Sequence, residues 1–116
     1  MKYLYLLYAD ESKMPAPGSP EMLGQLEAYN AFFKEVNDNG VVRGGDPVQG
    51  SASSVTVRAR NGSVETTPGS FSSNGDQIIG FYVLDVASQD EAVQYAAKIP
   101  AAQIGAIEVR PILDLN

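Results

Sequence analysis

The chain has 116 residues, of which 44% are hydrophobic and 19% are charged, and its formal net charge is −6. It contains no Cys and no His, which excludes disulfides, thiolate nucleophiles, zinc sites built on these residues and every mechanism that uses an imidazole as acid or base. We therefore expect one domain over residues 1–116, with no cofactor and no bound metal. The acidic balance also argues against nucleic acid as a partner.

The first apolar segment, residues 2–8, has no polar alternation, so it predicts a strand that is covered on both faces. It is too short to span a bilayer and is followed by acidic residues rather than a cleavage pattern. We therefore expect a cytoplasmic protein with no membrane partner.

A long helix is predicted between Ser19 and Asn39. Ser19-Pro20-Glu21 supplies an N-cap, a proline at the first helical position and an acid in the first turn, and Asn39-Gly40 supplies a left-handed stop. The apolar stripe predicted to face the core consists of Met22, Leu23, Leu26, Tyr29, Phe33 and Val36.

The middle of the chain predicts a short extended piece, a turn and a hairpin. Residues 41–43 are extended and the glycines and proline of 44–47 predict a turn. Residues 54–60 alternate in polarity and are followed by Asn61-Gly62, the preferred type I′ turn, before a return strand at 63–67. Residues 67–76 are rich in Gly, Ser, Pro and Asn and predict a mobile loop.

The last third of the chain predicts strand, helix and strand. Residues 77–86 form a second strand that is apolar on both faces. Residues 88–91 form a capping box, and the helix that follows must stop before Pro100. Its residues predicted to face the core are Ala92, Val93, Ala96 and Ile99. Residues 106–113 are the final strand.

This order of elements predicts a ferredoxin-like α+β fold, in which two helices cover one face of an antiparallel sheet and a hairpin is added. Segments 2–8 and 78–84 are predicted to be the central strands because both are apolar on both faces. The helices leave one apolar face open, so we expect a homodimer that packs sheet against sheet. The alternative is that the hairpin folds back over the open face within one chain.

The chain resembles the YCII-related family, in particular the branch called DGPF-domain proteins. The likeness rests on MKYLYLLYADE at 1–11, GVV at 40–42, TVRAR at 56–60, GFYVLDV at 80–86, DEA at 90–92, KIPAA at 98–102 and IEVRP at 107–111. It implies a dimeric α/β barrel related to the ferredoxin-like fold. The Asp-Gly-Pro-Phe motif aligns with residues 68–71, where Gly69 and Phe71 match and the carboxylate is missing. The His–Asp chemistry suspected for some members cannot be carried over, since no His is present.

Carboxylates at strand ends are the candidates for a polar site. Asp10 and Glu11 follow the first strand and Asp46 follows the short strand after the helix, so they are predicted to converge at the sheet edge beside Arg43. Asp10 is the best candidate for a carboxylate base. The alternative is that these groups only solvate loops and seed a turn.

Aromatic residues are the candidates for an apolar wall. Tyr3, Tyr5 and Tyr82 lie on the two central strands, and those that face the open side would line a cleft between subunits; Phe71 in the loop is a possible plug. The alternative is core or interface packing. The leading hypothesis is a cleft that binds a small organic ligand through Asp10, Arg43, Asp46, Tyr5, Tyr82 and Phe71. The alternatives are a regulatory module associated with transcription regulators and a small enzyme that uses Asp10.

Overall fold

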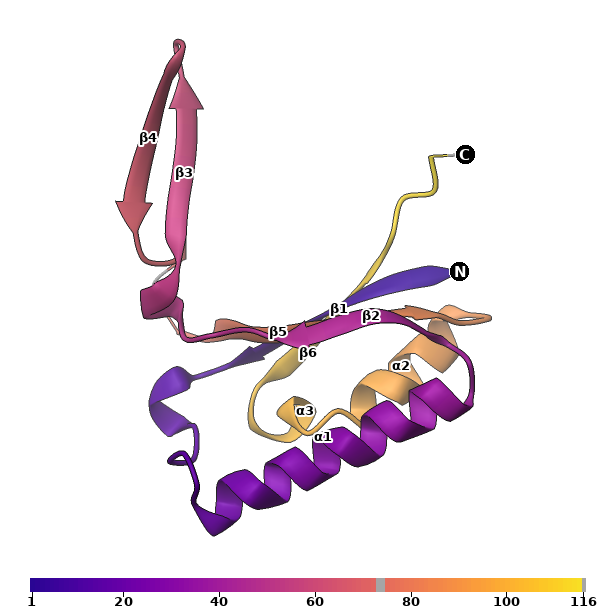
Figure 1. The fold of residues 1–116 in the computed structure, drawn as a ribbon. Helices are drawn as coiled ribbons and strands as arrows, with labels where there is room; N and C mark the ends of the chain where they lie inside the picture. The colour runs from indigo at the N-terminus through magenta and orange to yellow at the C-terminus, as the bar shows by residue number, and fades with distance from the viewer. Residues whose placement is uncertain (73–74, 116) are drawn as a thin grey trace.

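A four-stranded antiparallel sheet forms the centre of the structure, with the strands in the order β2-β5-β1-β6 (Figure 1). The structure is a computed structural model, and it describes residues 1–72 and 75–115. The strands of this sheet are β1 (Lys2–Ala9), β2 (Val42–Pro47), β5 (Gln77–Asp85) and β6 (Ala106–Pro111). β1 and β5 are central, as predicted, and the sheet order is that of a ferredoxin-like α+β fold.

The helices lie together on one face of this sheet (Figure 1). They are α1 (Pro20–Asp38), α2 (Gln89–Ala97) and the short α3 (Ala101–Ile104), which was not predicted; two 3₁₀ turns are η1 (Glu11–Lys13) and η2 (Ser51–Ser53). The predicted helix ends are confirmed. Ser19 Oγ accepts a hydrogen bond from the Met22 N–H at 3.2 Å, and Gly40 has a φ of +70° just after α1.

The core lies between the sheet and the helices. Alternate residues of β1 point towards the helices and are buried, namely Tyr3, Tyr5, Leu7 and Ala9, and they pack with Phe32, Val36, Leu84, Ala92 and Ile99. The other residues of β1 point to the opposite side, where the strand register pairs them with β5. We call this surface the open sheet face; it consists of Leu4, Leu6, Tyr8, Phe81 and Val83, all partly exposed.

The residues that α1 and α2 turn towards the core differ in part from those predicted. On α1 the buried residue is Phe32 rather than Phe33, and Leu23 and Leu26 are about half exposed. Leu26 and Phe33 instead line a pocket that separates part of α1 from the sheet, which is why they remain accessible. On α2, Tyr95 is buried and Val93 is 51% exposed.

The segment predicted as a turn at residues 44–47 is part of β2. It pairs with β5 after a bulge between Val42 and Gly44, so sheet pairing overrides the local turn preference. The glycine at 45 is needed for close approach, since a Cβ there would lie 2.6 Å from Tyr82 Cδ1.

The hairpin forms as predicted but stands away from the rest of the chain. β3 (Val55–Arg60) and β4 (Ser63–Pro68) form a separate two-stranded sheet, and Asn61 and Gly62 have the positive φ values of a type I′ turn. Figure 1 shows it projecting on the side of the sheet opposite the helices. It does not fold back over the open sheet face, which was the alternative to dimerisation.

The remaining differences concern segment ends. β6 ends at Pro111, not at 113, although the Ile112 N–H still donates to the Lys2 carbonyl at 2.9 Å. Residues 73–74 of the predicted loop at 67–76 lie outside the described residues. Within the described part of the chain, no helix has the length and apolarity needed to cross a membrane.

Candidate functional site

A pocket of about 580 Å³ lies between α1 and the β2–β5 edge of the sheet, on the helix side. Most of its wall is apolar and comes from four parts of the chain: α1, the segment before it, the sheet, and residues 48–50 after β2. The apolar lining includes Leu7, Met14, Met22, Leu26, Phe33 and Ile79. A concave site of this size with an apolar wall and a few polar groups is the usual form of a small-molecule site.

Two tyrosines line this pocket. Tyr29 projects from α1 and Tyr82 from β5, and both line the wall. Burial, together with the neighbouring Tyr29, raises the pKa of Tyr82 to about 12, and burial also raises the pKa of Tyr29. The Tyr82 ring packs edge-on against Phe32 with 5.1 Å between ring centroids, which fixes its orientation. Both hydroxyls are therefore neutral at physiological pH, and that of Tyr29 is hydrogen-bonded to the Ala101 backbone.

Two carboxylates, Glu11 from η1 and Asp46 from β2, also line the pocket. Glu11 accepts hydrogen bonds from the Ser51 N–H at 2.7 Å and from the Ser51 hydroxyl at 2.5 Å. The Ser51 side-chain and backbone hydrogen bonds lower the pKa of Glu11, which keeps it ionised and joins η1 to η2. Among the described residues, no Lys or Arg lines the pocket, so its charge is negative.

The Glu11–Ser51 contact predicts a pH-dependent contribution to stability. Because the folded-state pKa of Glu11 lies below its ordinary value of 4.5, the contribution is present above that value and disappears as the pH falls through the folded-state pKa. We expect Glu11→Gln to lower the melting temperature at pH 7, with the gap from the unmodified protein closing towards pH 3. Melting curves by circular dichroism from pH 3 to 7 measure it.

The control for this prediction is Glu27→Gln, on the exposed side of α1. It is expected to leave the melting temperature within experimental scatter at each pH, as surface substitutions usually do. A gap for Glu11→Gln that stays constant from pH 7 to pH 3 would contradict an electrostatic origin.

Asp10 lies beside the pocket but does not line it. It caps η1, where its Oδ1 accepts hydrogen bonds from the Ser12 hydroxyl at 2.6 Å and the Ser12 N–H at 2.9 Å. These bonds lower its pKa, the hydroxyl contributing most. A carboxylate with a lowered pKa is a weak base at neutral pH, so this environment argues against general-base chemistry at Asp10.

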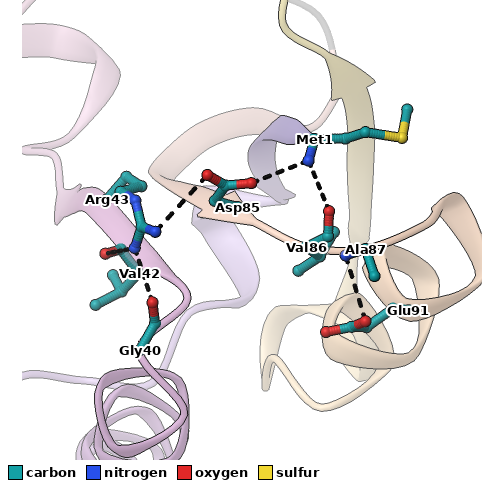
Figure 2. Close-up of polar contacts among 8 residues, drawn as sticks. All are labelled: Met1, Gly40, Val42, Arg43, Asp85, Val86, Ala87 and Glu91. Atoms are coloured by element: carbon teal, nitrogen blue, oxygen red, sulfur yellow. Dashed lines mark hydrogen bonds and ion pairs between the residues drawn. The ribbon is translucent and has the colours of Figure 1, made fainter.

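Arg43 is held at a different place, as Figure 2 shows. Its guanidinium donates to the Gly40 carbonyl at 2.8 Å and the Val42 carbonyl at 3.1 Å, and Nη2 lies 3.7 Å from Asp85 Oδ2. Asp85 also accepts from the Met1 ammonium group at 3.0 Å, and this hydrogen bond is the main cause of its lowered pKa. Arg43 thus satisfies carbonyls beyond the end of α1 and does not line the pocket.

Tyr5 belongs to the core, not to a cleft. Its side chain is fully buried and its hydroxyl donates to the Ala92 carbonyl at 2.9 Å. Tyr3, Tyr5 and Tyr82 all lie on the helix side of the sheet, which leaves none of them on the open sheet face. Of these three only Tyr82 lines the pocket.

Phe71 lies apart from this pocket. It is 76% exposed, its ring lies 5.2 Å from the Arg58 guanidinium carbon, and it lines a second hollow of about 690 Å³ at the base of the hairpin. The pocket therefore brings together Asp46 and Tyr82 from the six proposed ligand-binding residues. It also includes Glu11, which was one of the strand-end carboxylates expected to converge with Asp46, and Tyr29, which the helical pattern assigned to the core.

Among the described residues, no group of three or more Asp and Glu side chains is placed to hold a metal ion. The acids of α2 have a capping role instead. The Glu91 N–H donates to Ser88 Oγ at 3.2 Å, and the Glu91 carboxylate accepts from the Ala87 N–H at 3.3 Å (Figure 2).

Comparison with known proteins gives a family and a relative. The model of the YCII-related domain matches residues 1–116. An uncharacterized protein of Rhizobium meliloti (strain 1021) is 32% identical over 117 residues, an alignment that covers 97% of this chain and 92% of the relative. Both likenesses extend over nearly the whole chain, including the pocket and the hairpin. The chain therefore belongs to the YCII-related family.

Proposed function

We propose that this protein binds a small organic ligand in the pocket between α1 and the β2–β5 edge. The observation that supports the proposal is the pocket itself, about 580 Å³ with a largely apolar wall that also includes Tyr29, Tyr82, Glu11 and Asp46. Small-molecule sites are typically clefts of about 300–1,000 Å³ with a few polar groups that fix orientation. A core packed only for stability leaves no void of this size.

The charge of the pocket selects the ligand class. Glu11 and Asp46 repel an anion, and no basic residue among the described lining residues offsets them. The ligand is therefore a neutral or cationic molecule with an apolar body and a hydrogen-bonding group that meets Tyr29 or Tyr82. Carboxylate and phosphate ligands are expected to bind more weakly than their neutral or amine analogues.

Filling the pocket tests this proposal. A library of neutral, amine and carboxylate compounds is screened by thermal shift, because a ligand held only by the folded state raises its melting temperature. Hits are then titrated against Leu26→Trp, whose larger ring occupies the pocket, and we expect their affinity to fall at least about tenfold, or about 1.4 kcal/mol.

Leu23→Trp is the matched control. It makes the same change on the same helix, where Leu23 is 54% exposed and does not line the pocket, so binding is expected to be retained. Ligands that bind Leu26→Trp as tightly as the unmodified protein would place the binding site elsewhere, and a screen that finds only anions would overturn the proposed ligand class.

We further infer that two chains form a homodimer through the open sheet face. The apolar part of this face consists of Leu4, Leu6, Tyr8, Phe81 and Val83, with Glu108 and Arg110 beside it on β6, and no helix of the described chain covers it. A contiguous apolar face of this kind on a soluble chain indicates an interface, and a two-fold axis closes such a face most simply. Light scattering at micromolar concentration is expected to give the mass of two chains.

Several finer expectations stay predictions. The described walls of the pocket come from one chain. The pocket would be a cleft between subunits only if the partner chain reached its mouth. Assignment to the DGPF branch, the cytoplasmic location, the regulatory module and the enzyme that uses Asp10 likewise stay predictions. No contact in the site favours either of the last two over ligand binding.

A further inference from the structure

The β3–β4 hairpin has an apolar face that nothing in its own chain covers. The strand register places Val55, Val57 and Ala59 on one face together with Val64 and Pro68 of the neighbouring strand. Val55, Val57 and Val64 are 63%, 61% and 71% exposed. An isolated two-stranded hairpin is at best marginally stable in water, so a hairpin with this face exposed requires a partner surface.

The position of the hairpin indicates where that partner lies. Figure 1 shows the hairpin rising on the side of the sheet opposite the helices, which is the side of the open sheet face. Its strands have 6 residues each, which is about 20 Å of reach, whereas packed sheets lie only about 10 Å apart. A second chain packed on the open sheet face would therefore lie alongside the hairpin of the first chain. The hairpin is long enough to extend past the sheet of the second chain and reach the side of that chain.

The charge of the hairpin complements that of a second copy. Residues 55–68 carry Arg58, Arg60 and Glu65, which gives the hairpin a net charge of +1. The net charge of the whole chain is −6, so the remaining residues together carry −7. The hairpin is thus the cationic part of an anionic protein. Attraction between these parts favours docking of the hairpin onto another copy, most strongly at low ionic strength.

The exposed surface leaves room for such an interface. The accessible area is 7869 Å², against about 6,100 Å² expected for a folded monomer of this mass. The radius of gyration is 16.0 Å, against about 13 Å expected for this length. The excess area of about 1,700 Å² exceeds the roughly 800 Å² that each partner buries in a standard interface.

We propose that the hairpin is an exchanged arm, whose apolar face docks on the flank of a second copy of this chain. The proposal rests on the homodimer inferred above and adds a second contact region to it. Since a two-fold axis repeats every contact, the partner's hairpin docks in the same way on the first chain.

Substitutions on the two faces of the hairpin test the arm. The double variant Val57→Thr with Val64→Thr makes the apolar face polar while keeping residues with high strand propensity, so the hairpin itself is retained. The control is Thr67→Val, which lies on the opposite face because Thr67 pairs with Thr56. The dimer dissociation constant of each is measured by sedimentation. We expect the double variant to weaken the dimer at least about tenfold, and the control to stay within about threefold of the unmodified protein.

A deletion and a protease assay give independent readouts. The Gly69 N–H donates to the Ser54 carbonyl at 2.7 Å, so an Asn-Gly turn in place of residues 55–68 closes the chain without strain. We expect this deletion to weaken the dimer at least as much as the double variant. In the unmodified protein, trypsin should cut after Arg58 and Arg60 quickly in the dilute monomer and slowly in the dimer.

The outcomes separate the arm from the dimer. A dimer that is unchanged both by the deletion and by the double variant would overturn the arm while leaving the sheet interface and the ligand pocket intact. Tryptic cleavage at the same rate above and below the dissociation constant would overturn it as well. An unmodified protein that is monomeric at every concentration would overturn the dimer and the arm together, with the ligand pocket still unaffected.

Discussion

Replacing Leu6 with lysine is expected to convert the protein from two chains to one at micromolar concentration. Leu6 lies in the middle of β1 on the open sheet face, where its register partners are Phe81 on β5 and Glu108 on β6. A lysine there is solvated in the monomer and lies beside the Glu108 carboxylate. Glu108 already pairs with Arg110, so the added lysine has no carboxylate of its own. In a sheet-to-sheet dimer each chain buries this unmatched charge, which costs several kcal/mol for each ion.

The measurement is light scattering together with the melting temperature. The control is Leu23→Lys, which adds the same charge at an exposed position of α1 on the helix side of the sheet. It is expected to leave the dimer intact. A Leu6→Lys protein that keeps the mass of two chains would show that the open sheet face is not the interface.

Truncation of Tyr5 is expected to produce the largest loss of stability of any single substitution proposed for this protein. Tyr5 is fully buried in the core, and Tyr5→Ala removes a whole aromatic ring, which costs about 3–5 kcal/mol of unfolding free energy. Tyr5→Phe keeps the ring and removes only the hydrogen bond to the Ala92 carbonyl, for which we expect about 1–2 kcal/mol. Urea denaturation measures both.

Tyr8→Phe provides the comparison on the same strand. Tyr8 lies on the open sheet face and is partly exposed in one chain, so at concentrations where the protein is monomeric the loss of its hydroxyl is expected to cost less than about 0.5 kcal/mol. Equal losses for Tyr5→Phe and Tyr8→Phe would show that the bond from Tyr5 to α2 contributes nothing beyond the packing of the ring.

Local chemistry was sufficient to predict the order of the elements and the sheet. The N-cap at Ser19, the left-handed Gly40 and the Asn61-Gly62 turn each act over a few residues, so the sequence contains all that is needed. The central position of β1 and β5 followed from residues that are apolar on both faces, because a strand with a neighbour on each side is the position that best suits such a sequence.

The errors arose where distant segments decide the outcome. Gly44 and Gly45 have a turn composition, but pairing with β5 extends them and the Tyr82 ring fills the space that a side chain at 45 would need. On α1, the apolar side of the helix is wider than the part that packs against the sheet. The sequence alone does not show that Phe32 is buried and Phe33 exposed, because this depends on the position of the pocket between α1 and β2.

The candidate site was predicted in part for the same reason. Asp46 was predicted in a turn and Tyr82 on a central strand, and both line the pocket. Arg43 was expected at the same place, but it lies in the bulge of β2 between Val42 and Gly44, where carbonyls and Asp85 hold its guanidinium. The sequence did not distinguish Tyr29 from a core residue, since helix positions that face a pocket and helix positions that face the core are both apolar or aromatic.

The sequence by itself determined the α+β class, the absence of imidazole and thiol chemistry, the acidic charge and the excess of apolar residues on the two central strands. These follow from composition and from periodicities of a few residues. Only the tertiary structure decided where that apolar surface goes: one part into the core, one part around a pocket with two tyrosines and two carboxylates, and one part onto the open sheet face and the hairpin. The physical reason is that burial is a property of contacts between segments far apart in the chain, and the pattern of one segment does not specify its neighbour.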